Sequence, residues 1–339
     1  MNKKTPRARA ASTALLLAGG LLSTAASAQS CDRACLAGLV DQVVASMPRH
    51  DPDKLPLAQT YAATENSHPA ALGMMTAWRT ITAAGKPALL ALDVQRGGAY
   101  FALPVSEAGS RTALWGRIRV ADRKITEIEI FLNRSRGDHG FSFSADQMGA
   151  NYKVLMAPPA KREKASRDEL EKIARASFDA ADPYKLDSAP GCQFTEVGTL
   201  VIDPGLDDVP HKAGDPDPEA PLGCMFPPFR PTDKKARVIA VDEENGFVVT
   251  AAVIRGMVYP YPWRGHMMSA FIPDDMKAPQ QAQDEWIARK KAAGQAGLLA
   301  PAAATAEVMQ VIQVYDGKMH ASQINVYLSG PDGHSDWVR

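Results

Sequence analysis

The chain has 339 residues, with 38 basic and 38 acidic side chains and four cysteines. The charges are interspersed, which argues against the basic stripe that nucleic-acid-binding proteins carry. After residue 28, no stretch approaches the roughly 18 consecutive apolar residues that a membrane-spanning helix requires. A chain of this length is too long for one small hydrophobic core, so the sequence predicts two domains.

Residues 1–28 have the three parts of a secretory signal. A basic start precedes an apolar centre at 15–22, and the segment ends on the small residues Ala26-Ser27-Ala28. We therefore expect a periplasmic or secreted protein with no membrane insertion after cleavage of the signal. The alternative interpretation of this segment is a retained N-terminal anchor. Because the signal carries basic but no acidic residues, the mature chain would be mildly acidic.

The four cysteines favour disulfides over a metal site. In an oxidising compartment an even number of cysteines usually pairs, and no histidine here lies at zinc-ligand spacing. Three pairings are open. The simplest joins Cys31 to Cys35 and Cys192 to Cys224, because each bridge then stays within one half of the chain.

The sequence contains two diverged copies of one pattern. Each copy opens with a periodic apolar helix, over 36–47 and over 166–178, where Ser166 and Glu169 form a capping box. An Asp-Pro break, a Lys-Leu pair and a Thr-Glu pair follow in the same order in both copies. The Thr-Glu pairs are Thr64-Glu65 and Thr195-Glu196.

The later halves of the copies also match. The pattern at 112–134, and again at 306–328, predicts two strands joined by a tight turn. Apolar and polar residues alternate along both strands. A match of several elements in one order predicts a gene duplication. We expect an α+β fold with a first unit at 29–150, a linker at 151–165 and a second unit at 166–339. Two stretches of the second unit, 203–233 and 273–304, have no counterpart and are interpreted as insertions.

The chain resembles a family of exported two-copy domains of unknown function within the nuclear transport factor 2-like, SnoaL-like superfamily. The resemblance rests on six stretches of both copies: Cys31 to Leu36, Thr64 to Asn66, Pro87 to Leu92, Arg123 to Ile125, Val241 to Gly246 and Gly330 to Trp337. It implies two tandem cone-shaped units, each a curved, mostly antiparallel sheet packed on helices around a cavity. Related cones include acid–base lyases and isomerases that need no cofactor, and others only bind or dimerise.

The first copy offers an acid–base pair. Glu65 and His68 lie three residues apart, and burial would raise the pKa of a carboxyl group into the useful range. The expected pocket walls and oxyanion-binding residue are Trp78, Tyr100, Trp115 and Arg117. The alternative for Glu65 is a carboxylate at a strand end that caps nearby N–H groups. Its recurrence as Glu196 suits that structural role.

The second copy offers His320 as general base and Arg255 as the group that holds an oxyanion. The ligand contacts expected here are Tyr259, Tyr261, Trp263, His266 and Asn325. The alternatives are a solvent-facing histidine and a proline–aromatic run that forms a dimer contact.

The sequence is compatible with two functions. The first is an exported lyase or isomerase without metal or other cofactor, acting on a small, aromatic or polyketide-like substrate. The alternative is a non-catalytic small-molecule-binding or scaffold protein, and a homodimer is open in either case. An accessible site lined by apolar residues, with every histidine and glutamate outside it, would favour the binding protein.

Overall fold

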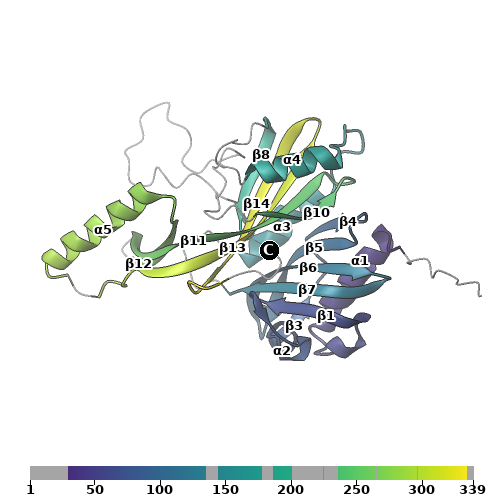
Figure 1. The fold of residues 1–339 in the computed structure, drawn as a ribbon, viewed down its shortest axis with the longest axis horizontal. Coiled ribbons are helices and arrows are strands. Elements are labelled where there is room, and N and C mark those ends of the chain that lie inside the picture. Colours follow the sequence, from purple (N-terminus) through teal and green to yellow (C-terminus); the bar gives the residue numbers. More distant parts are fainter. Residues whose placement is uncertain are drawn as a thin grey trace, which may run out of the picture.

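A computed structural model describes residues 30–134, 144–177, 186–200, 224, 236–263, 266–295 and 297–333. The predicted signal at 1–28 and most of the predicted insertion at 203–233 lie outside the described residues. The chain is α+β, with two similar units that each contain a seven-stranded mixed sheet (Figure 1). None of the helices in the described ranges is both long and apolar enough to cross a membrane.

The first unit contains α1 (Arg33–Ser46), η1 (Pro52–Lys54), β1 (Leu57–Glu65), β2 (His68–Pro69), η2 (Leu72–Met74), α2 (Ala77–Thr80), β3 (Ile81–Ala84), β4 (Leu89–Asp93), β5 (Gly98–Glu107), β6 (Ser110–Ala121) and β7 (Lys124–Asn133). The helices α3 (Ala145–Lys153) and η3 (Val154–Met156) connect the units. The second unit contains α4 (Arg167–Ser177), β8 (Ser188–Glu196), β9 (Thr199–Leu200), β10 (Arg237–Asp242), β11 (Phe247–Trp263), β12 (His266–Pro273), α5 (Lys277–Ala292), β13 (Ala302–Tyr315) and β14 (Lys318–Ser329).

The two sheets share one strand order. The first runs β2-β1-β7-β6-β5 and the second β9-β8-β14-β13-β11, with β4 and β10 as antiparallel neighbours of β5 and β11. Within each sheet one pair is parallel, β1 with β7 and β8 with β14. Both parallel pairs shift register at the equivalent place, at Leu57–Ala62 in β1 and at Ser188–Gln193 in β8. These matching irregularities give a residue-by-residue correspondence between the units.

Helix α1 covers one face of the first sheet, here called the inner face. Its helically spaced apolar residues, among them Leu36, Val40 and Val43, pack into one buried cluster with sheet residues such as Leu103 and Ile128. The side chains of this cluster occupy the space between α1 and its sheet. The amphipathic helix predicted over 36–47 therefore forms, and it supplies the core of the first unit.

The opposite, outer faces of the two sheets pack on each other. One buried cluster contains Tyr100 and Trp115 from the first unit and Phe247 and Val311 from the second. Tyr152 of α3 belongs to the same cluster, so the predicted linker begins inside the shared core. The units therefore pair within one chain.

Two buried aspartates clamp the units in a reciprocal manner. Arg167 of α4 binds Asp93 of the first unit at 2.5 and 3.2 Å, and Arg33 of α1 binds Asp242 of the second at 2.6 and 3.0 Å. Asp242 also accepts a hydrogen bond from the backbone N–H of Leu92 at 3.0 Å. Asp93 likewise accepts one from the backbone N–H of Val241 at 3.1 Å. Both aspartates are fully buried. Each carboxylate thus contacts a cation and an N–H of the other unit.

Four residues after each clamping aspartate lies a glycine that has no room for a side chain. Gly246 has φ +70°, and a Cβ there would overlap the carbonyl oxygen of Val314. We expect Gly246→Ala to lower the free energy of unfolding by about 1–3 kcal/mol, because it adds a clash to backbone strain. Gly317→Ala is the control, since φ is +64° there and no heavy atom lies within 4 Å of its Cβ. Equal denaturation midpoints for the two variants would contradict the clash.

Candidate functional site

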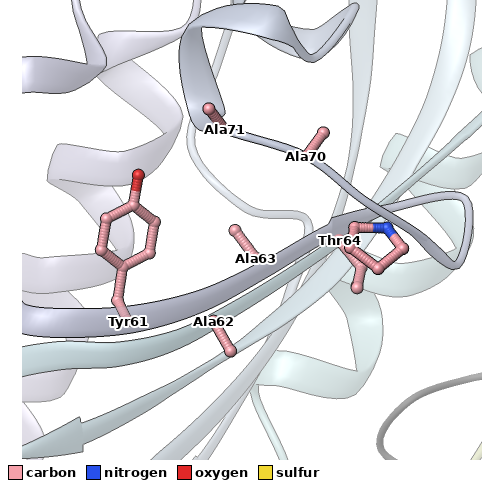
Figure 2. A pocket seen from close by; sticks show the side chains of 7 residues that line it. Tyr61, Ala62, Ala63, Thr64, Ala70 and Ala71 are labelled. Carbon is pink, nitrogen blue, oxygen red and sulfur yellow. The ribbon is translucent and has the colours of Figure 1, made fainter.

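An open groove lies on the first unit between β1 and the segment 69–71, here called the β1 groove (Figure 2). Its volume is about 570 Å³, within the usual range of roughly 300–1,000 Å³ for small-molecule pockets. Seven residues without charged side chains line it: Tyr61, Ala62, Ala63, Thr64, Pro69, Ala70 and Ala71.

The β1 groove exists because β1 and β2 separate after a short pairing. Their register ends at Thr64–Pro69, and one further hydrogen bond joins the Ala70 N–H to the Ala63 carbonyl at 3.2 Å. The chain then leaves toward η2, so a gap opens between Ala71 and Tyr61 (Figure 2). The alanines on both sides are too small to fill it, and Tyr61 at its end is 36% exposed.

Glu65 lies next to the β1 groove but binds the start of α2. Its carboxylate accepts hydrogen bonds from the backbone N–H groups of Thr76 and Ala77, at 3.0 and 2.7 Å, and from the Thr76 hydroxyl. This arrangement matches the capping role that was the alternative interpretation of Glu65. His68, on β2, is exposed.

The three aromatic residues predicted as pocket walls are core residues. Trp78, Tyr100 and Trp115 are each at most 2% exposed. Trp78 donates from Nε1 to the Ser46 hydroxyl at 2.8 Å within the core of the first unit. Tyr100 and Trp115 lie in the cluster between the units. None of the three lines the β1 groove.

Arg117 and Asn325 also hold the fold together. Arg117 is paired with Glu127 and Glu129 at 2.9 and 2.8 Å, so carboxylates already occupy its guanidinium. Asn325 donates from Nδ2 to the Tyr100 hydroxyl at 2.7 Å, and its Oδ1 accepts from the Tyr152 hydroxyl at 2.9 Å. Asn325 therefore links the second unit to the first unit and to α3.

In the second unit, His320 stacks on Tyr315 with ring centroids 3.4 Å apart, and its Nε2 lies 3.2 Å from the Tyr315 carbonyl. Burial lowers the pKa of His320 below its usual value. Tyr259 is buried beside Ile287 of α5, whereas Tyr261 and Arg255 are exposed. The side chains of the remaining predicted contacts, Trp263 and His266, lie outside the described residues.

The structure places Glu65 and His68 opposite each other in the β1–β2 hairpin, but it does not join them to Arg255 or His320. Over the described ranges, no side-chain hydrogen bond or ion pair joins any two of Glu65, His68, Arg255 and His320. Glu65 and His68 belong to the first unit, while Arg255 and His320 belong to the second. Within the same ranges, no group of three or more His, Cys, Asp or Glu side chains is arranged to hold a metal ion.

No protein-family model and no curated protein sequence matches the chain. Among solved structures, a de novo designed protein with a curved β-sheet is similar to this chain, at 11% sequence identity and a TM-score of 0.26. The match covers 37% of this chain and 98% of that one. The resemblance to the SnoaL-like superfamily stays a prediction.

Sequence reasoning missed a buried carboxyl group between the units. Glu307 of β13 is 3% exposed, and its Oε2 has no hydrogen-bond partner among the described residues. Burial, and next the nearby Glu129 of the first unit, raise its pKa to about 8. Its Oε1 lies 3.2 Å from the Ser329 hydroxyl. An acidic residue within an apolar, alternating strand was the signal in the sequence that could have identified it.

Sequence reasoning also missed the β1 groove as a site. Of its lining residues, only Thr64 was noted, as part of the repeated Thr-Glu pair. The available signal was a run of alanines on a predicted strand, because alanine is depleted in strands and leaves space beside the backbone.

Proposed function

We propose that the protein is an exported, non-catalytic binding protein and that the β1 groove is its binding site. The observation that carries the proposal is the lining of the groove, which contains no histidine, glutamate or arginine. Glu65, which directly follows the lining residue Thr64, is bound to α2. An uncharged groove beside an engaged carboxylate suits the retention of an apolar ligand better than proton abstraction.

Export is supported by the disulfides. Cys31 is bonded to Cys35, and Cys192 to Cys224, as in the simplest predicted pairing. Such bonds persist mainly in oxidising compartments such as the periplasm or the extracellular space. Together with the predicted signal at 1–28, they favour a periplasmic or secreted location.

The proposal also includes the shape of each unit. We interpret each unit as a cone of the SnoaL-like type, with the β1 groove as the open mouth of the first cone. The shared strand order and the helix packed on each sheet support this interpretation.

A ligand screen with a groove-filling variant tests the proposal. We expect some small apolar or aromatic compounds to raise the melting temperature without forming a product detectable by mass spectrometry. At about 100 times its Kd, such a ligand would stabilise the protein by about 2.7 kcal/mol. Ala63→Phe should abolish the shift by filling the groove, whereas Ala83→Phe, at an exposed position on β3, should retain it. A ligand that stabilises both variants equally would exclude the groove as the site.

The lyase or isomerase stays a prediction that the same screen addresses. If a compound is converted to product, His320→Ala and Glu65→Ala should separate the two candidate bases. Turnover that survives in both variants would eliminate both residues as the base.

A further inference from the structure

The matched strands of the two units differ where the β1 groove lies. The register of the parallel pairs places Thr64 with Glu129 and Thr195 with Gln323, so the two threonines are equivalent. Counting back along each strand, Ala63 corresponds to Phe194 and Tyr61 to Cys192. The groove-lining residues of β1 therefore have defined counterparts on β8.

In the second unit this position is filled. Phe194 is 2% exposed and belongs to a buried apolar cluster, whereas Ala63 in the first unit leaves space. Cys192 is bonded to Cys224, whose Sγ also lies 3.4 Å from the Gln193 carbonyl. The insertion of the second unit thus places a residue against β8, and Cys192 is 6% exposed.

In the first unit β2 pairs with the outer edge of β1 at Thr64 and Glu65, and within the described part of the chain the edge is unpaired before Ala63. Ala63 directs its carbonyl to the outer edge of β1, where Ala70 binds it. Tyr61, two residues earlier, directs its backbone groups to the same edge because strand geometry has a period of two. Tyr61 has no ladder partner among the described residues, on either side of β1. This free edge adjoins the β1 groove.

We infer that the β1 groove binds an extended peptide segment, which adds as a strand to the outer edge of β1 and places a large apolar side chain over Ala63. The inference rests on the proposed function and specifies the ligand class. The peptide main chain would pair with Tyr61, as strand addition requires, and alanines permit the close approach. The peptide side chain would fill the space that Phe194 fills in the second unit.

The test uses the mature protein and a fluorescently labelled, acetylated and amidated peptide, Thr-Val-Phe-Val-Thr. The control peptide has the same sequence with alternate backbone nitrogens methylated, which removes the donors on one edge. We expect the parent peptide to bind about tenfold or more tightly than the methylated one, and to slow hydrogen–deuterium exchange within 57–63. Ala63→Phe should weaken binding by at least about tenfold, and Ala83→Phe should leave it unchanged.

The outcomes separate this inference from the proposed function. Equal binding of both peptides, or protection only outside 57–63, would overturn strand addition. If the peptides fail while a small apolar compound still stabilises the protein and loses this effect in Ala63→Phe, the peptide inference fails and the binding function stands. If neither peptide nor small compound acts through Ala63, both are wrong. Because phenylalanine already occupies the equivalent position in the second unit, we expect Ala63→Phe to fold.

Discussion

Replacing Asp93 with alanine is expected to lower the free energy of unfolding by about 3–5 kcal/mol. Asp93 is fully buried and accepts hydrogen bonds from Arg167 and from the backbone N–H of Val241. Without the carboxylate, a guanidinium whose side chain is only 14% exposed would lose its strongest partner at the unit interface. A buried charge without a partner is among the most destabilising changes that one substitution can cause.

The measurement is equilibrium denaturation, with Glu244→Ala as the matched control. Glu244 forms an ion pair with Lys164 at 2.7 Å, but both side chains are about half exposed, so its loss should cost no more than about 1 kcal/mol. Asp242→Ala, which breaks the reciprocal clamp, should behave like Asp93→Ala. If Asp93→Ala were as mild as Glu244→Ala, the clamp would contribute little to the association of the units.

Glu307 should make the protein less stable as the pH rises from about 4.5 to about 8. The carboxyl group of the unfolded chain titrates near 4.5, whereas burial, and next Glu129, raise the folded-state pKa to about 8. Below pH 4.5 both states are protonated. Between these values only the folded state keeps the proton, so the unfolded state is increasingly favoured. The stability lost over this window is on the order of 3–5 kcal/mol.

The variant Glu307→Gln isolates this effect, because glutamine is neutral at every pH. Denaturation curves at a series of pH values should show the wild-type protein losing stability relative to Glu307→Gln between pH 5 and 8. Glu285→Gln, at an exposed position on α5, should follow the wild-type curve. Parallel curves for the wild-type protein and Glu307→Gln would show that Glu307 titrates normally.

The two-unit α+β architecture could be predicted because its signals are local. The Thr-Glu pairs that end β1 and β8, and the hairpins at 112–134 and 306–328, each depend on neighbouring residues. The helix over 36–47 followed from apolar spacing alone. These patterns repeat in order, so the two similar units could be predicted without knowledge of any long-range contact.

The candidate site was harder to predict, because both faces of each sheet are buried. Alternation along a strand separates two faces, but it does not show that one meets a helix and the other meets the second unit. Trp115 and Tyr100 were therefore assigned to a pocket, whereas they pack between the units. Similarly, a capping carboxylate such as Glu65 looks the same in sequence as a catalytic one.

The reciprocal arrangement of Asp93 and Asp242 fastens together two sheets that belong to one polypeptide. Their association therefore does not weaken on dilution, as that of two separate subunits would. A frame that stays assembled at any concentration tolerates divergence at its margins. In the second unit a disulfide joins β8 to Cys224, whereas in the first unit the corresponding part of β1 borders an open groove. Two similar units within one chain thus present two different versions of the same surface, one filled and one accessible.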